Sequence, residues 1–147
     1  MGWELEDVEK PFVAQLQIQG WSHVEGSIDD PAVTGRASFT EVIQEEVLRE
    51  QLLALNPGPD GNSWLDESRL QEAVSAVTRP AAHKLMEANA EITELLLKGL
   101  SVDGLAGWDG GRQQVIRYID WDTPANNRFT VVNEFRVDCI HGFNRGK

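Results

Sequence analysis

The stretch QVIRYIDWDTPANNRFTVVNEFRVDC, residues 114–139, decides the fold that the sequence predicts. Apolar and polar residues alternate in both halves of this stretch, and a period of two is typical of β-strands that are buried on one face. Between the halves, Pro124 presets its own φ angle, while Asn126 and Asn127 tolerate left-handed backbone and bond nearby main chain. The pattern therefore predicts two antiparallel strands joined by a turn, a β-hairpin over residues 112–139.

The preceding part of the chain, residues 1–99, is predicted to be mainly helical. Apolar residues recur there at helical spacing in four segments. The first helix begins near Lys10, the second follows a capping box over residues 38–41, the third covers about 65–78, and the fourth starts at Pro80. We therefore expect an α+β fold in which about four helices pack on a small antiparallel hairpin, within a single domain of residues 1–147.

Composition indicates a soluble cytoplasmic protein. Hydrophobic residues make up 41% of the chain and charged residues 25%, as in ordinary globular domains. Cys139 is the only cysteine, so an internal disulfide is impossible. No signal peptide is recognisable, and no apolar stretch approaches the roughly 20 residues of a membrane-spanning helix.

The formal net charge of −11 is unevenly distributed. Residues 112–147 carry six basic and four acidic side chains, whereas residues 1–111 carry seven basic and 20 acidic ones. A protein that binds DNA by itself is expected to present a basic surface. We therefore expect this chain alone to bind DNA weakly, and its acidic helical part to face solvent or a protein partner.

A specific motif occupies residues 119–137, and shorter motifs precede it. The long motif reads Ile119-Asp120-Trp121-Asp122-x-Pro124-x-Asn126-Asn127-x-Phe129-x-Val131-Val132-Asn133-x-Phe135-x-Val137; the shorter ones are Glu9-x-x-Phe12-x-x-x-Leu16-x-x-x-Gly20-Trp21, Leu52-x-x-Leu55-Asn56-Pro57, Asn89, and Gly99-Leu100-x-Val102. Together they resemble the N-terminal domain of the R subunits of type I restriction enzymes, over nearly the whole chain. Glu134 departs from the pattern, because the family usually has Gln there.

The resemblance implies an incomplete nuclease domain of the restriction-endonuclease-like class. The parent would be a type I site-specific deoxyribonuclease that translocates along DNA with ATP, cuts it with Mg²⁺, and works with modification and specificity subunits. That class uses a Pro-Asp … Glu-x-Lys constellation, which this chain does not contain after Cys139. The main catalytic residues are therefore expected to be absent from this chain, and the fragment itself is expected to be inactive and to bind neither cofactor. Glu9 matches an early acidic position of the family, where the resemblance implies an accessory catalytic role. The alternative, which the sequence alone favours, is a solvated carboxylate at the start of the helix.

Other candidate sites are weaker. Asp120 and Asp122 could hold a hard cation or could shape the turn, and we favour the turn. The histidines are far apart, and Cys139 with His141 is the only near pair, which is too little for a zinc site.

Two further expectations concern partners. A lone hairpin is marginally stable, so its free edge is expected to pair with another copy of the chain, to be covered by a helix, or to stay poorly ordered. The alternative function, from a different class, is a non-catalytic acidic module that docks a partner protein.

Overall fold

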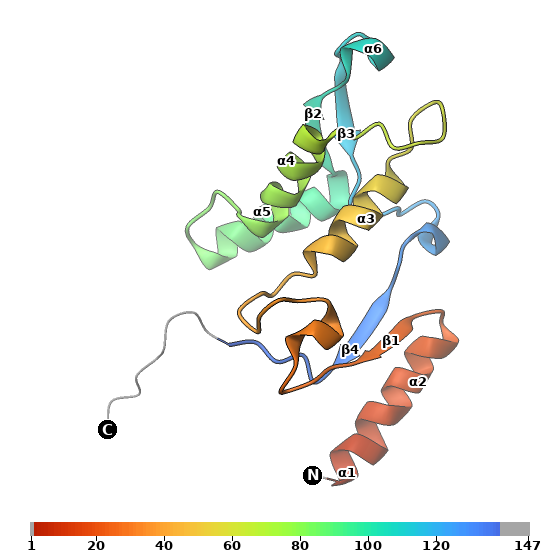
Figure 1. The fold of residues 1–147 in the computed structure, drawn as a ribbon, viewed down its shortest axis with the longest axis vertical. Helices are drawn as coiled ribbons and strands as arrows, with labels where there is room; N and C mark the ends of the chain where they lie inside the picture. The colour runs from red at the N-terminus through yellow and green to blue at the C-terminus, as the bar shows by residue number, and fades with distance from the viewer. Residues whose placement is uncertain (1, 139–147) are drawn as a thin grey trace. The chain divides into compact units, whose positions relative to one another are not determined.

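The computed structural model of the chain describes residues 2–138 (Figure 1). The chain divides into two compact units. The first unit comprises Met1–Gln44 and Arg128–Lys147, and the second comprises Glu45–Asn127. The single domain proposed for residues 1–147 stays a prediction, and the two units are described separately.

The first unit combines the N-terminal helical segment with two strands. Its elements are α1 (Gly2–Glu4), the π-helical η1 (Leu5–Glu9), α2 (Lys10–Ile18), β1 (Ser22–Glu25), the 3₁₀-helix η2 (Pro31–Thr34) and β4 (Thr130–Asn133). Strands β1 and β4 pair in parallel, with Ser22 opposite Thr130 and Glu25 opposite Asn133. The rings of Trp21 and Phe129 stack at 5.1 Å between centroids, just before both strands begin.

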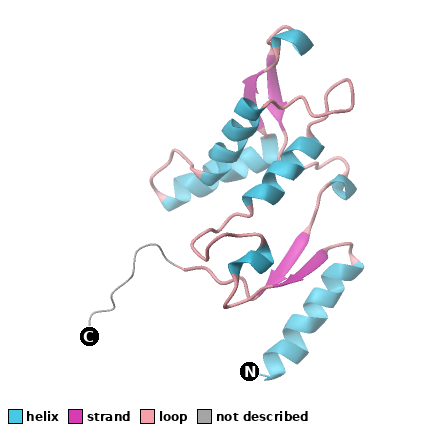
Figure 2. Cartoon of the chain, viewed as in Figure 1, coloured by secondary structure: helices cyan, strands magenta, loops and turns pink. Residues whose placement is uncertain are grey.

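The second unit holds the main hydrophobic core. Its elements are α3 (Glu45–Leu55), α4 (Glu67–Thr78), α5 (Leu85–Lys98), β2 (Leu100–Asp103), α6 (Ala106–Asp109), β3 (Gln113–Ile116) and the 3₁₀-helix η3 (Pro124–Asn126). Strands β2 and β3 pair antiparallel (Figure 2). The buried cluster consists of Leu52, Trp64, Leu65, Leu70, Ala73, Val74, Val102, Ile116 and Tyr118.

The predicted α+β class is confirmed, because helices and small sheets share the chain. The predicted hairpin over residues 112–139 is wrong. Both apolar runs contain a strand, but β3 pairs with β2 and β4 pairs with β1, in separate sheets. The alternation of side chains specifies which face of a strand is buried, and it leaves the choice of partner strand open. Because residues 112–139 form no hairpin, the expectation of oligomerisation through a hairpin edge loses its basis.

Two helix starts also differ from the prediction. The second helix begins at Glu45 rather than after residues 38–41, because Ser38 Oγ accepts from the Thr40 N–H inside a local turn. The fourth helix begins at Leu85, five residues beyond Pro80. There the Glu91 carboxylate of α5 accepts hydrogen bonds from the main chain after Pro80 and holds it as a loop. Over residues 2–138, no helix is both long enough and apolar enough to cross a membrane.

Candidate functional site

Glu9 takes part in a three-residue hydrogen-bond chain within the first unit. Asn133, the last residue of β4, donates from Nδ2 to Glu9 Oε1 at 2.8 Å. The Asn133 Oδ1 atom lies 2.8 Å from Nε2 of His23 on β1. Because Nδ2 already donates to the carboxylate, Oδ1 is the acceptor and His23 Nε2 carries the proton. The amide of Asn133 therefore links an imidazole on one strand to a carboxylate on the N-terminal helical segment.

Tight backbone packing sets the position of Asn133. The Gly26 N–H donates to Asn133 O at 3.0 Å, and a Cβ atom on Gly26 would lie only 2.4 Å from that oxygen. Glu134 then adopts a φ angle of 52°, in the left-handed region that residues with a side chain rarely occupy. The chain thus turns sharply at the end of β4, directly after Asn133 reaches towards Glu9.

A cavity of about 250 Å³ surrounds this chain of hydrogen bonds. It is lined by Leu5, Glu9, Lys10, Val13, Gln17, His23, Glu25 and Asn133. Two carboxylates and one imidazole therefore share one hollow. Among residues 2–138, however, no group of three or more His, Cys, Asp or Glu side chains is placed to hold a metal ion. This hollow can present Glu9 to a ligand, but its own side chains do not fit a magnesium site.

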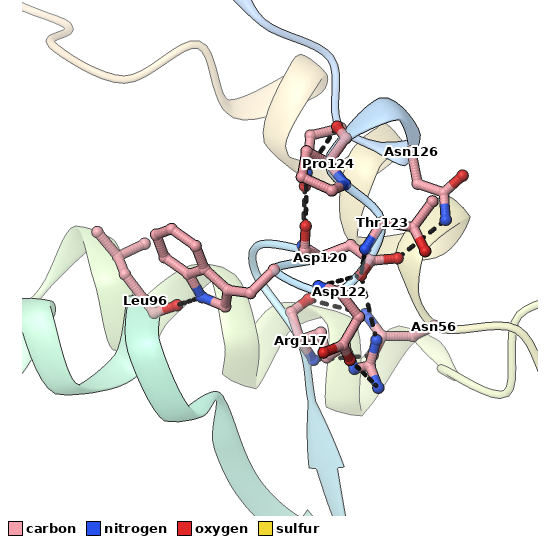
Figure 3. A network of polar contacts seen from close by, with 10 residues as sticks. Asn56, Leu96, Arg117, Asp120, Asp122, Thr123, Pro124 and Asn126 are labelled. Carbon is pink, nitrogen blue, oxygen red and sulfur yellow. Dashed lines mark hydrogen bonds and ion pairs between the residues drawn. The ribbon is translucent and has the colours of Figure 1, made fainter.

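A polar loop in the second unit surrounds Asp120 (Figure 3). Asp120 Oδ1 accepts from the N–H groups of Asp122 at 3.1 Å and Thr123 at 2.9 Å, and Oδ2 accepts from Asn126 Nδ2 at 2.9 Å. These hydrogen bonds, led by that from Asn126, hold the pKa of Asp120 below its usual range. The carboxylate is occupied with its own loop, which supports the turn-shaping role over the cation site.

Two asparagines complete the loop by replacing backbone partners. Asn127 accepts from the Asp120 N–H at 2.8 Å and donates to the carbonyls of Asp120 and Pro124. Asn56, at the end of α3, accepts from the Arg117 N–H at 2.8 Å and donates to Arg117 O at 2.9 Å. The carboxamide of Asn56 thus binds the backbone of Arg117 as a neighbouring strand would. Motif spacing alone does not reveal this role.

Arg117 and Trp121 are oriented while remaining accessible. Nη1 of Arg117 lies 3.6 Å from Asp120 Oδ1, and Nη2 lies 3.9 Å from Asp122 Oδ2. Trp121 donates from Nε1 to Leu96 O at 3.0 Å, yet 56% of the residue is exposed. Trp and Arg are the residue types that most often dominate protein interfaces. The loop therefore presents an interaction surface more readily than a reaction centre.

Arg36 is a buried cation that the sequence analysis does not anticipate. It is only 2% exposed, and its guanidinium lies 3.7 Å from the centroid of the Phe135 ring. Nη1 donates to the carbonyls of Glu41 and Arg136, and Nε donates to Thr34 Oγ1. These contacts assign Arg36 to the packing of the first unit.

Among the described residues, the histidines form no metal site. His83 and His23 lie in different units, and His83 is exposed. Cys139 and His141 lie outside the described residues. Sequence reasoning missed Asn133 as the partner of Glu9 and His23 as the partner of Asn133. His23 and Asn133 lie 110 positions apart, and the parallel pairing of β1 and β4 brings them together.

Comparison with known proteins identifies the family. Residues 4–146 match the family described as "Type I restriction enzyme R protein N terminus". The chain is also 29% identical over 144 residues to the "Type I restriction enzyme HindI endonuclease subunit" of Haemophilus influenzae, an alignment that covers 95% of this chain and 13% of that relative. No solved structure matches the chain. The chain therefore belongs to the family of type I restriction enzyme R protein N termini.

Proposed function

We propose that the whole protein is a type I restriction endonuclease R subunit that uses ATP to translocate along DNA and cleaves it with Mg²⁺. The observation that carries the proposal is the family match over residues 4–146, supported by a relative whose name is that of an endonuclease subunit. In the cytoplasm, the R subunit would work with modification and specificity subunits. The restriction-endonuclease-like assignment of the fold belongs to the same proposal.

Glu9 is the one residue of this chain that we assign to the cleavage site, as an accessory carboxylate. Its support is geometric, because Asn133 fixes one carboxylate oxygen at 2.8 Å inside a hollow that Glu25 and His23 also line. Magnesium would polarise the phosphodiester when bound, but the residues described here do not fit its site on their own. We therefore assign none of the described residues to the metal, and we expect this chain alone not to cut DNA.

The test uses the whole R subunit assembled with its modification and specificity subunits. We expect Glu9→Gln to lower the rate of DNA cleavage while ATP hydrolysis is unchanged, because translocation does not involve this carboxylate. Glu6→Gln is the matched control, since Glu6 is exposed and pairs with Lys10 on the same helical segment. Equal cleavage rates for both variants would remove Glu9 from the site, and an R subunit that never cleaves DNA would refute the proposal itself.

A second candidate function is a non-catalytic acidic module that docks a protein partner. Two observations favour it: the second unit carries 14 acidic and seven basic side chains, and Trp121 is oriented but 56% exposed. Binding to a basic protein surface by a whole protein without nuclease activity would favour this function over the first.

A further inference from the structure

Strand β3 has one edge paired and one edge open. Antiparallel pairing places Ile116 opposite Leu100 and Gln114 opposite Val102, and the Gly104 N–H continues the ladder by donating to Arg112 O at 2.8 Å. Hydrogen-bonding directions alternate along a strand, so Arg112, Gln114 and Ile116 direct their N–H and C=O groups towards β2.

An independent contact confirms that the backbone groups of these residues face β2. A Cβ atom on Gly99, which immediately precedes β2, would lie 2.5 Å from Ile116 O, so that carbonyl points towards β2. The backbone groups of the alternate residues, Gln113, Val115 and Arg117, must then point to the other edge.

The open edge is only partly satisfied. At Arg117, both outward groups bind the Asn56 carboxamide, with distances of 2.8 and 2.9 Å. Within residues 2–138, the outward backbone groups of Gln113 and Val115 make no hydrogen bond. Both residues are exposed, with Val115 at 51%. The Asn56 carboxamide thus takes the place of one residue of a third strand. The next two outward-facing positions, Val115 and Gln113, are free to pair with an added strand.

A hollow lies beside the free positions. It has a volume of about 340 Å³ and is lined by Ala54, Leu55, Asn56, Pro57, Trp64, Val115, Arg117, Asp120 and Asn126. Because Asn56 binds the outer edge of β3, this hollow lies on the same side. Side chains of an added strand project alternately to the two faces, so one beside Val115 would reach the hollow. Its apolar wall of Leu55, Pro57 and Val115 suits an aliphatic side chain.

Charge restricts which chains can dock. The second unit, Glu45–Asn127, carries 14 acidic and seven basic side chains, and the whole chain has a net charge of −11. Arg117, the cation at the hollow, already faces Asp120 and Asp122. The field of this unit therefore attracts a basic polypeptide and repels both a nucleic acid and a second copy of the chain.

We propose that the outer edge of β3 binds an extended basic segment of a partner protein, which adds to β2–β3 as a third strand and places an aliphatic side chain in the hollow beside Val115. Recognition of this type takes its affinity from main-chain hydrogen bonds and its specificity from alternate side chains. The site does not depend on nuclease activity, and it shares no lining residue with the hollow around Glu9.

The test uses the full chain, isotope-labelled, with the probe peptide acetyl-Lys-Val-Lys-Val-Lys-Val-Lys-amide. We expect saturating peptide to slow amide hydrogen exchange at Gln113 and Val115 by about tenfold or more, because each amide gains a hydrogen-bond partner. Exchange at Gln114 and Ile116 should change little, since their N–H groups already point towards β2. Equal slowing at all four positions, or at none, would overturn the proposal.

Two variants at Gln113 and two other probes test the binding edge and the assigned partner. Gln113→Pro should weaken peptide binding about tenfold, because proline removes an outward donor without touching the bonds to β2, whereas Gln113→Ala should bind as the native chain does. A peptide with Glu in place of each Lys should bind at least tenfold more weakly. Equal binding of the Glu peptide, tighter binding of oligothymidine, or protection caused by dimer formation without peptide would each contradict the assigned partner. The exchange pattern of the native chain decides the matter should the proline variant fail to fold.

Discussion

Replacing Asn56 by alanine removes a side chain that stands in for backbone. Asn56 is 4% exposed, accepts from the Arg117 N–H and donates to the carbonyls of Arg117 and Leu52. In Asn56→Ala, the Leu52 carbonyl keeps its helical environment, but both outward groups of Arg117 lose their partner. The variant therefore isolates the contribution of one carboxamide to the edge of the second unit.

The expected cost follows from two unsatisfied groups. Leaving a buried donor or acceptor without a partner costs about 1–3 kcal/mol for each group. Because Arg117 is half-exposed, water can partly replace the amide, so we expect Asn56→Ala to lower the free energy of unfolding by about 2–3 kcal/mol. With a urea m-value of about 2 kcal/mol/M, the unfolding midpoint should fall by about 1–1.5 M.

The assay is urea unfolding followed by far-ultraviolet circular dichroism, together with amide exchange at Arg117. Asn62→Ala is the matched control, because Asn62 lies in an exposed turn and its side chain donates to the Asp60 carboxylate, while its backbone bonds are unchanged by the substitution. We expect that control to stay within about 0.5 kcal/mol of the native chain. If Asn56→Ala costs no more than Asn62→Ala, or if the Arg117 amide exchanges no faster, the strand-like role of Asn56 is wrong.

Four further predictions concern buried contacts and pH. Burial raises the pKa of Tyr118, the only tyrosine, above its normal value of about 10, so an ultraviolet titration of the folded chain should show its phenol ionising at a higher pH than a free tyrosine. The stability that goes with this shift is complete below about pH 10 and should be lost as the pH rises further. Tyr118→Phe, which removes a 2.7 Å bond to a carbonyl of α4, should cost about 1 kcal/mol in the free energy of unfolding at neutral pH; no loss would refute that bond. The lowered pKa of Asp120 contributes stability that is complete above its unfolded pKa of about 3.9 and is lost as the pH falls below that value. In Asp120→Asn, the free energy of unfolding should therefore fall less steeply with decreasing pH in the acid range, and an unchanged slope would contradict this role of Asp120. Gly26→Ala should destabilise the first unit by about 1–3 kcal/mol, since its Cβ would lie 2.4 Å from Asn133 O, whereas Gly107→Ala, where the space is open, should cost less in the same urea assay.

Sequence reasoning identified the elements better than their partners. Alternating residues located β3 and β4, because a half-buried strand imposes a period of two. Their pairing could not be predicted, since β4 takes a partner from the other end of the chain. The capping box over residues 38–41 was misleading for a different reason, because the same side chains satisfy a turn equally well.

At the candidate site, too, local features were predicted from the sequence and contacts between distant segments were not. Glu9 was chosen through family resemblance, and its placement beside Asn133 and His23 depends on contacts between distant segments. The turn-shaping role of Asp120 was accessible from sequence, because Asp and Asn bond to main chain only a few residues away. Local chemistry was therefore predictable, whereas any feature that needs two separated segments had to come from the structure.

The parallel pairing of β1 with β4 has a consequence for biosynthesis. His23 on β1 and Asn133 on β4, whose side chains are hydrogen-bonded, lie 110 positions apart, so β1 leaves the ribosome long before its partner strand exists. Joining the two ends across an unstructured loop of that length would cost roughly 4 kcal/mol in chain entropy, and prior folding of the intervening Glu45–Asn127 shortens the effective loop. We therefore expect co-translational folding to complete the second unit first, while nascent β1 waits unpaired and exposed to chaperones. A ribosome that stalls before residue 130 would release a chain with a finished interior segment and an unpartnered N-terminal strand.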